Sequence, residues 1–364
     1  MKMIRNWLNK LRPAAPLPLT PAQATQSGAE VVSCAANSMD LQPALSAIMQ
    51  RIENVSASLN GRPLVVLIGE NHELPAHKIL QTLLLTKLHG QRPDKIACGM
   101  EISGNKLGQI VSCIENKNLT SAEKREISTQ DPSGQKALSA YLAYINPLSA
   151  PVARHTQLAF CRSSKIPTRF TDAADNSAED LDSEDPVTGA IMKAHPPGWR
   201  DNDKGTEGTG AYDLKIRNLV MTAEAQKHIQ ETGAQLYIQQ AGVAHILGSK
   251  IHKAAYKDSL QARFKQAGFD TLSVIVTSKD FDLKDIPAFE LPTDLSDCLF
   301  IGNIDEKRVR GYDGDEGEYI KALLKKSQAD LQIFDYNTEP KTRNELQEYV
   351  DTQARHWIKP RPTL

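Results

Sequence analysis

Short unbroken apolar runs alternate with segments of helical period along the middle of the chain. The run at 64–68 contains no polar residue, which is typical of a strand buried on both faces. The segment 75–88 follows it, and its leucines and isoleucines recur at the spacing of an amphipathic helix. Because this alternation continues to Thr277, it predicts an α/β fold with a mainly parallel sheet and helices on both faces.

The predicted strands share an apolar run bounded by polar residues, at 64–68, 95–100, 166–171, 235–240 and 271–277, with shorter apolar pieces at 298–301 and 331–336. The predicted helices share a recurrence of apolar residues every three or four positions, at 41–55, 75–88, 106–115, 135–145, 152–162, 211–231, 256–267 and 318–329.

The two ends of the chain are patterned more weakly than the middle. We expect a flexible leader at 1–39, one α/β domain at 40–280 and a C-terminal appendage at 281–364 that packs on the same domain. Residues 1–12 carry Lys and Arg without an acid, and their apolar residues have helical spacing. This tip fits either a terminal turn docked on the domain or a peripheral contact with a membrane surface, including a role in export.

Two segments interrupt the regular pattern. Residues 172–210 are rich in Asp, Glu, Gly and Pro and follow the end of a predicted strand, where open α/β sheets bind ligands. A lid over a substrate and a plain disordered insertion explain them equally well. The acids and glycines at 313–318 lack the spacing of a calcium loop and are expected to form a solvated turn.

Composition excludes several classes of protein. The 43 basic and 44 acidic side chains nearly balance, which argues against a nucleic-acid partner. Five cysteines without a C-x-x-C pair argue against a disulfide scaffold and indicate a reducing, cytosolic-type compartment. No apolar stretch is long enough to predict a transmembrane span, and no apolar region follows the basic tip as in a Sec signal peptide.

Several familiar catalytic signatures are missing. The sequence has no G-x-S-x-G elbow, no phosphate-binding P-loop and no G-x-G-x-x-G after a strand. His72-Glu73 and His77 resemble the zinc motif H-E-x-x-H, but the spacing is one residue too long. Pro75 would also disrupt the helix that this motif needs, so a zincin is excluded.

One sequence form occurs twice at a predicted strand end. Gly69-Glu70-Asn71-His72 follows the first strand of the core, and Gly242-Val-Ala-His245 follows the fourth. In each copy a supporting glycine, Gly69 or Gly242, lets the chain turn sharply, and the histidine then projects at the mouth of the sheet. Glu70 and His72 are two residues apart, so an extended backbone places them on the same side.

A further carboxylate, Glu101, ends the second predicted strand. The carboxyl ends of parallel strands meet at one edge, so two carboxylates and two imidazoles are expected to converge there. Such a set fits a divalent metal held by His72, Glu101 and His245, or a water activated by general-base action. The competing interpretation is structural: strand-end histidines often stabilise turns, and Glu101 could cap the following helix.

These residues carry a resemblance to a known superfamily. Gly69-Glu-Asn-His72, Gly99-Met-Glu101, Arg217-Asn-Leu-Val-Met221 and Ala241-Gly-Val-Ala-His245-Ile-Leu-Gly248 resemble erythromycin esterases, ChaN haem-binding lipoproteins and TraB/Tiki-type proteases. The resemblance spans 64–277 and implies that Glu70, His72, Glu101 and His245 line an active cleft. It further implies that Arg217 reaches into the cleft to hold a carboxylate or an anionic intermediate, with Asn218 supporting it. Apart from the resemblance, the sequence allows Arg217 and Asn218 to form simply the exposed face of a helix.

The chain departs from that superfamily in three respects. It has neither the signal peptide and lipobox of ChaN-like proteins nor the membrane anchor of Tiki-type enzymes, and its insertion at 172–210 has no counterpart. The substrate is therefore not implied by the resemblance. A polar leader before such a domain is similar to bacterial effectors that type III secretion injects into host cells.

Three functional hypotheses follow. The first is a hydrolase that cleaves an ester or amide bond in a small molecule or peptide, as a virulence effector that triggers host cell death. The second is a binding protein for haem or another planar ligand in the same cleft, although the charged neighbours of the histidines suit water better than haem. The third is a non-catalytic interaction module that binds a host protein through the insertion.

Overall fold

The computed structural model describes residues 28–103, 150–172 with gaps, 214–249, 254–278, 292–309 except 293, and 315–329. Several predictions lie outside the described residues, namely the basic tip at 1–12, the helices at 106–115 and 135–145, the insertion after Asp172 and the apolar piece at 331–336.

The described strands are β1 (Glu30–Ser38), β2 (Leu64–Glu70), β3 (Ile96–Ser103), β4 (Thr168–Asp172), β5 (Leu236–Gly242), β6 (Asp270–Val276) and β7 (Cys298–Ile304). The described helices are α2 (Gln42–Ser58), α3 (Pro75–Gln91), α10 (Leu214–Thr232), α11 (Val243–Leu247), α12 (Leu260–Gln266) and α13 (Asp315–Lys326), with the 3₁₀ turn η3 (Tyr256–Asp258) before α12.

One seven-stranded sheet organises the molecule, in the order β1-β7-β6-β2-β5-β3-β4. Every pair of neighbouring strands in it is parallel. The strands at its centre, β2 and β5, are buried along their whole length, which explains their nearly unbroken apolar sequences. The predicted α/β fold class with a parallel sheet is therefore confirmed.

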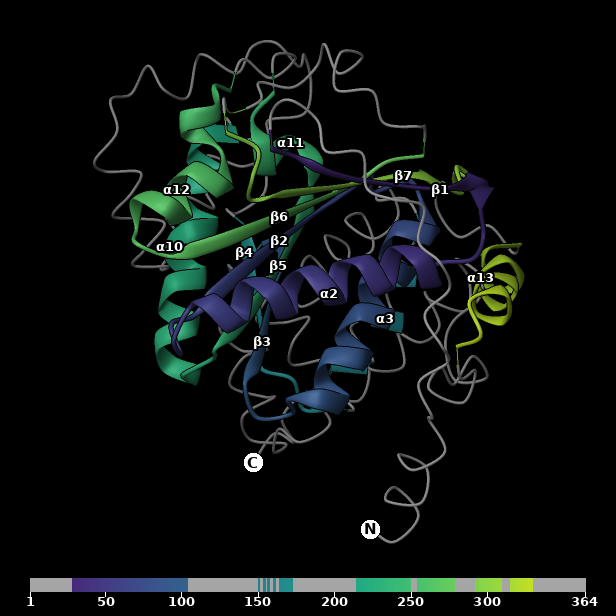
Figure 1. Ribbon diagram of the computed structural model, residues 1–364, viewed down its shortest axis with the longest axis horizontal. Coiled ribbons are helices and arrows are strands. Elements are labelled where there is room, and N and C mark those ends of the chain that lie inside the picture. The colour runs from purple at the N-terminus through teal and green to yellow at the C-terminus, as the bar shows by residue number, and fades with distance from the viewer. Residues whose placement is uncertain are drawn as a thin grey trace, which may run out of the picture.

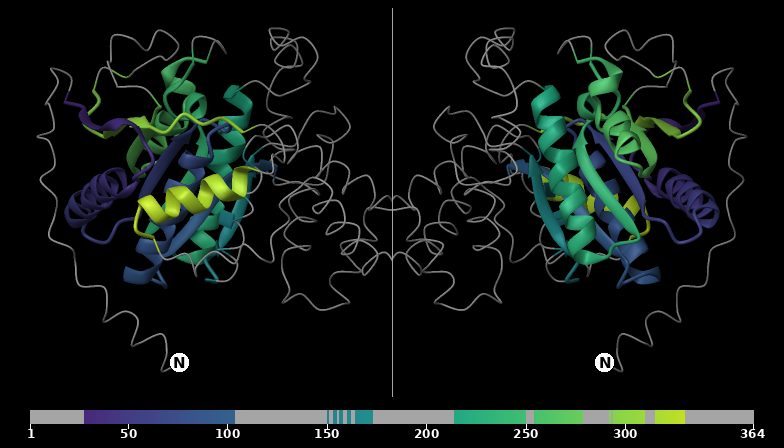
Figure 2. Two further views of the ribbon diagram at one scale, coloured as in Figure 1. Left: turned by 90° about the vertical axis from the view of Figure 1, so that its right-hand side faces the viewer. Right: turned by 90° about the vertical axis from the view of Figure 1, so that its left-hand side faces the viewer.

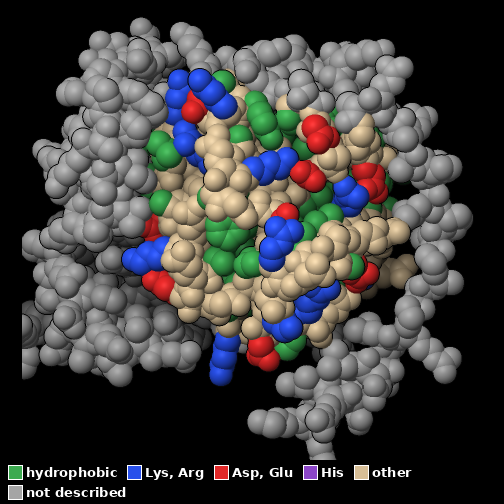
Figure 3. Space-filling model, turned by 60° about the vertical axis from the view of Figure 1, so that its left-hand side comes forward, with side chains coloured by type: hydrophobic (Ala, Val, Ile, Leu, Met, Phe, Trp, Pro, Cys, Tyr) green, Lys and Arg blue, Asp and Glu red, His purple; other side chains and the backbone are tan. Residues whose placement is uncertain are grey.

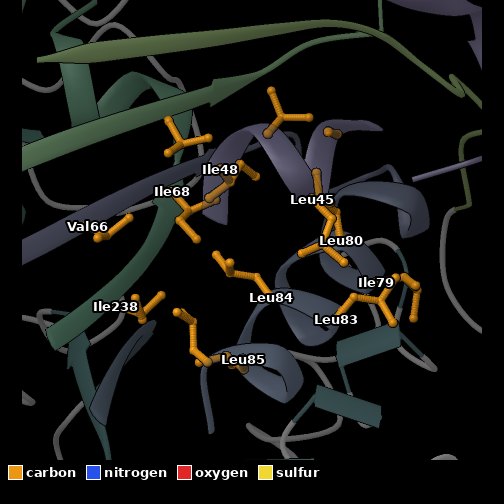
Figure 4. Close-up of a cluster of buried hydrophobic side chains, with 14 of the residues drawn as sticks. Leu45, Ile48, Val66, Ile68, Ile79, Leu80, Leu83, Leu84, Leu85 and Ile238 are labelled. Carbon is orange, nitrogen blue, oxygen red and sulfur yellow. The ribbon is translucent and has the colours of Figure 1, made fainter. Parts of the chain in front are cut away.

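One face of the sheet is covered by α2, α3 and α13 (Figure 1). Leu45 and Ile48 of α2 pack with Leu80 and Leu84 of α3 over Ile68 of β2 (Figure 4). Helix α3 begins at Pro75, whose fixed φ suits the first helical turn. Residues 75–85 of α3 are all buried, so this part of the helix is enclosed by its neighbours rather than exposed on the surface.

The opposite face is covered by α10, α11 and α12, whose apolar side chains form a second cluster with β5 and β6. The two views of Figure 2 show α13 in front of the sheet from one side and α10 in front of it from the other. Ser259 begins α12 as its N-cap, because its hydroxyl accepts a hydrogen bond from the Ala262 N–H at 3.2 Å.

A topological switch lies between β2 and β5. These strands are neighbours, but the helix after β2 covers one face and the helices after β5 cover the other. In open α/β sheets a crevice forms at such a point, outside the carboxyl ends of the strands, and ligands bind there. The register pairs Glu70 with Gly242, so both G-x-x-H segments leave the sheet side by side at this switch.

The structure differs from the expected organisation at both ends of the core. Residues Glu30–Ser38, expected to belong to the leader, form the edge strand β1. They carry few large apolar side chains because β1 pairs only with β7 and is mostly half-buried or exposed. Strand β7, expected in the appendage, lies inside the sheet between β1 and β6, so the sheet does not end at residue 280.

Four cysteines, Cys34, Cys98, Cys161 and Cys298, are buried and free in the described part of the chain. Within that part, no helix has the length and apolar character needed to cross a membrane. On the face shown in Figure 3, acidic and basic side chains are interspersed among polar and apolar ones.

Candidate active site

The carboxyl ends of β2, β3 and β5 bring the sequence-predicted residues together. Glu70 is the last residue of β2, His72 follows it in the next turn, and His245 lies in α11 directly after β5. Side chains alternate along a strand, so Glu70 extends towards α3 on one face and Glu101 extends towards α10 on the other. His72 lies between them and contacts both carboxylates.

His72 has one ring nitrogen engaged and one available. Its Nδ1 lies 2.8 Å from Glu70 Oε1, and since a carboxylate accepts, Nδ1 carries the proton. The lone pair of a neutral ring is then on Nε2, which lies 3.6 Å from Glu101 Oε2, too far for a hydrogen bond. The His72 side chain is 29% exposed, so water can reach it.

Glu70 is buried beneath His72 and is held by cations. Lys78 of α3 donates a hydrogen bond to Oε1, and Arg154 Nη2 lies 3.8 Å from the same oxygen. Burial alone would raise the pKa of Glu70, but Lys78, His72 and Arg154 outweigh it and hold that pKa well below its ordinary value. Glu70 is therefore a fixed carboxylate that orients His72 rather than a proton donor.

Glu101 accepts hydrogen bonds on both carboxylate oxygens. Its Oε1 accepts from Arg217 Nη2 at 2.6 Å and lies 3.2 Å from His245 Nε2, and its Oε2 accepts from the Gly242 N–H. Burial would raise the pKa of Glu101, but its electrostatic interactions with His245, His72 and Arg217 hold that pKa well below its ordinary value. Glu101 therefore anchors the surrounding donors as a carboxylate.

Arg217 bridges two strand-end carboxylates. Its Nε donates to Asp172 Oδ1 at 3.0 Å, and its Nη2 donates to both Asp172 and Glu101. Burial would lower the pKa of Arg217, but Asp172 and Glu101 raise it above its ordinary value. The side chain is 22% exposed and its Nη1 makes no hydrogen bond to the described residues, so one donor edge is left for a ligand.

Asn218 fixes the second histidine. Its Nδ2 donates to the Asp258 carbonyl oxygen at 2.9 Å, which leaves Oδ1 facing His245 Nδ1 at 2.6 Å. That nitrogen must then carry a proton, and Nε2 faces the Glu101 carboxylate. Both ring nitrogens of His245 thus face oxygen atoms of the protein, and its side chain is only 4% exposed. His245 is thus a hydrogen-bond donor in this site.

The two supporting glycines differ in their surroundings. A Cβ on Gly242 would lie 3.0 Å from His72 Nε2 and 3.5 Å from Glu101 Oε2, so this glycine leaves space beside the available nitrogen. A Cβ on Gly69 would meet Ile275 and Val243 at 3.2 and 3.3 Å instead. Gly242 therefore borders the site directly, whereas Gly69 allows close packing behind it.

The donor set does not fit the metal site suggested by the sequence. Among the described residues, no group of three or more His, Cys, Asp or Glu side chains has a metal-binding arrangement. Glu101 has both oxygens occupied by N–H donors, and the two ring nitrogens of His245 face Asn218 and Glu101. A metal held by His72, Glu101 and His245 would have to displace Arg217 and its hydrogen bonds.

Three residues of the site were missed in the sequence. Lys78 could have been found from the sequence, because it is the only charged residue at 75–86. A helix that is apolar on all sides is buried, so a charged residue in it is expected to be buried as well. Asp172 ends β4 just as Glu101 follows the core of β3, so the rule that found Glu101 applies to it as well. Arg154 lies in a partly described helical segment and had no signal in its spacing.

Comparisons with known proteins give distant likenesses. No protein-family model and no curated protein matches the chain. A solved structure of the type III effector HopBA1 is 15% identical, covers 70% of this chain and 94% of its own, and has a TM-score of 0.35. ChaN of Campylobacter jejuni, solved with cofacial haem, is 12% identical, covers 64% and 88%, and has a TM-score of 0.33. Neither likeness assigns a function at this level.

Proposed function

We propose that the chain is a hydrolase of ester or amide bonds in which His72 is the general base. One observation carries the proposal: Glu70 holds the His72 ring by Nδ1, which leaves Nε2 with its lone pair, partly exposed and beside the space above Gly242. A base oriented by a buried carboxylate is the arrangement that activates water or another nucleophile in many hydrolases.

The reaction balances with residues of this chain. Nε2 of His72 takes a proton from water while the water oxygen bonds to the carbonyl carbon, and the carbonyl oxygen becomes an oxyanion. The unengaged Nη1 edge of Arg217 is available to donate to that oxyanion. His72 then returns the proton to the leaving oxygen or nitrogen as the C–O or C–N bond breaks, which gives an acid and an alcohol or amine.

Glu101 and His245 would act by holding this geometry rather than by transferring protons. Glu101 fixes Arg217, His245 and the Gly242 backbone at once, so it sets the relative positions of the base and the oxyanion donor. The role of a positioning carboxylate suits its lowered pKa, because it remains charged at neutral pH.

The substrate class is a small molecule or peptide, and the proposed setting is a secreted bacterial effector that acts inside a host cell and triggers cell death. The resemblance in the sequence supports this setting, and the geometry around His72 supports the chemistry. Each can be tested without the other.

The chemical test compares purified wild-type chain with His72→Ala on a panel of p-nitrophenyl esters and aminoacyl p-nitroanilides. We expect hydrolysis above the buffer rate for wild type, and a loss of roughly 100-fold or more in His72→Ala, as for removal of a general base. His89→Ala is the matched control, since His89 lies in the last turn of α3, away from the strand ends. Equal rates for wild type and a folded His72→Ala chain would contradict the proposal.

The setting is tested by expressing both chains in plant or animal cells and counting dead cells. Cell death caused by wild type and by His72→Ala alike would favour the non-catalytic interaction module. The absorption spectrum of the purified chain tests the haem alternative, because a Soret band with stoichiometric iron would overturn the hydrolase proposal.

A further inference from the structure

A lysine is buried directly beneath the proposed base. Lys78 is in the first turn of α3 and its side chain is only 1% exposed. Its Nζ donates a hydrogen bond to Glu70 Oε1. Burying an ion pair brings little or no net stability compared with apolar residues of similar size, so stability alone does not account for this lysine.

Lys78 and His72 share a single acceptor atom. Oε1 of Glu70 accepts from Lys78 Nζ and also faces His72 Nδ1 at 2.8 Å. The negative charge that would stabilise a protonated His72 is therefore already shared with the Lys78 ammonium group. A positive charge on Lys78 also repels a second positive charge on the imidazole ring.

The other charged groups around the ring do not replace this effect. The groups that face His72 or its carboxylate partners come from several elements: Glu70 on β2, Lys78 on α3, Arg154, Glu101 on β3, Arg217 on α10 and His245 after β5. Arg217 and His245 contact Glu101, whereas Lys78 donates a hydrogen bond to Glu70 Oε1, from which Arg154 Nη2 lies 3.8 Å away. Removing Lys78 would therefore leave His72 beside a far less compensated carboxylate.

We propose that Lys78 is a positioning residue that acts on His72 through Glu70: it shares the Oε1 acceptor with the ring and so weakens the pull of the carboxylate on a proton of the ring. The catalytic importance of this effect rests on the proposed hydrolase function, but the effect on the His72 ring does not. Lys78 holds the carboxylate in place, and its charge decides how strongly that carboxylate attracts a proton to the ring.

The titration of Lys78 supports this role. Burial lowers the pKa of Lys78 to about 8, although Glu70 opposes the shift. Lys78 is thus charged at pH 7 and loses its proton as the pH rises through about 8. Above that pH Lys78 would be neutral, and the charge of the Glu70 carboxylate would be balanced only through its contacts with His72 and Arg154.

The experiment measures proton binding by His72 in the full chain without any substrate. The ring resonances are followed by NMR from pH 5 to pH 9.5 and are assigned by their loss in His72→Gln. Lys78→Met keeps a side chain of similar length but removes its charge. In this variant we expect the proton affinity of His72 to rise about tenfold, which raises its titration midpoint by about one pH unit. Lys78→Arg, which keeps the charge, should restore the wild-type midpoint, as should Lys87→Met on the exposed side of α3.

An unchanged or lowered midpoint in folded Lys78→Met would overturn the proposal. If that variant does not fold, Lys78→Gln is titrated in its place, and an unchanged or lowered His72 midpoint in the folded Lys78→Gln chain would refute the coupling. The hydrolase proposal fails on a different result, namely hydrolysis that survives in His72→Ala, so the two outcomes are separable.

Discussion

At the scale of single residues, Gly242 borders the available nitrogen of His72. Its backbone has φ of −56° and ψ of 141°, which an L-residue adopts without strain. An added methyl group would nevertheless stand 3.0 Å from Nε2 and occupy the place of an attacking water. We therefore expect Gly242→Ala to lower hydrolysis by at least about tenfold, with an unfolding free energy within about 1 kcal/mol of wild type.

The matched control is Gly90→Ala. Gly90 lies in α3 with open space around its Cα, so alanine is expected to leave hydrolysis unchanged and to stabilise the helix slightly. Rates are measured on the best substrate of the ester panel, and stability by urea unfolding. Full activity in Gly242→Ala would show that the space beside Nε2 is not where the reaction occurs.

The sequence predicts most of this site because strand ends obey a simple topological rule. Glu70, His72, Glu101 and His245 each follow an apolar run, and parallel strands bring such positions to one edge. The rule predicts which side chains lie close together, but it does not predict the chemical role of each. That His245 is closed depends on Asn218 and Asp258, which come from different elements of the chain.

At the scale of elements, α10 supplies two consecutive side chains with separate tasks. Arg217 extends to the carboxylates of β3 and β4, whereas Asn218, about 100° further around the helix, faces His245. Asn218 is fully buried and bonded through both of its polar atoms. The helix thereby locks the loop after β5 to the rest of the site.

Replacing Asn218 by leucine, of similar size, would leave His245 Nδ1 and the Asp258 carbonyl without this partner. Buried polar groups that lose their partner cost about 1–3 kcal/mol each, so we expect Asn218→Leu to lower the unfolding free energy by about 2–4 kcal/mol. Gln230→Ala, at an exposed position of the same helix, should lie within about 0.5 kcal/mol of wild type. Urea unfolding of the three chains is the measurement, and equal midpoints would mean that Asn218 does not hold the loop.

Central elements were easier to predict than peripheral ones, for a physical reason. Strands β2 and β5 are buried on both faces and therefore begin with runs of large apolar residues, which are visible in the sequence. Strand β1 at the edge buries few of its residues, and its Ser, Ala and Asn side chains resemble a linker. Its pairing with β7 depends on a segment some 270 residues away, which local patterning does not report.

At the scale of the whole molecule, the buried ionisable groups predict how stability depends on pH. Burial lowers the pKa of His77 to about 4 and keeps its ring neutral, with Nδ1 accepting a hydrogen bond from the Asn71 N–H. An unfolded histidine binds its proton near pH 6.5, so the unfolded state gains protons first. We expect the unfolding free energy to fall as the pH drops from about 6.5 to about 4, and less so in His77→Asn.

At still lower pH, the two buried glutamates dominate the pH dependence of the unfolding free energy. The pKa values of Glu70 and Glu101 lie well below the ordinary value in the folded chain, so unfolded glutamates bind protons while folded ones do not. Their contribution to stability is fully present above about pH 4.5 and is lost as the pH falls towards their folded pKa values. Urea midpoints at pH 7, 5, 4 and 3 should therefore decline most steeply at the acid end.

The variants Glu70→Gln and Glu101→Gln separate this cause from a general effect of net charge. Each variant removes one carboxyl group with a lowered pKa. The urea midpoint should therefore decline less between pH 5 and pH 3 than in wild type, whatever the stability of the variant at pH 7. The exposed Glu53→Gln in α2 changes the net charge equally and should leave the slope as in wild type. If all three variants kept the wild-type slope, folding would not lower the pKa of either carboxyl, and the cations around Glu70 and Glu101 would not stabilise their charged forms.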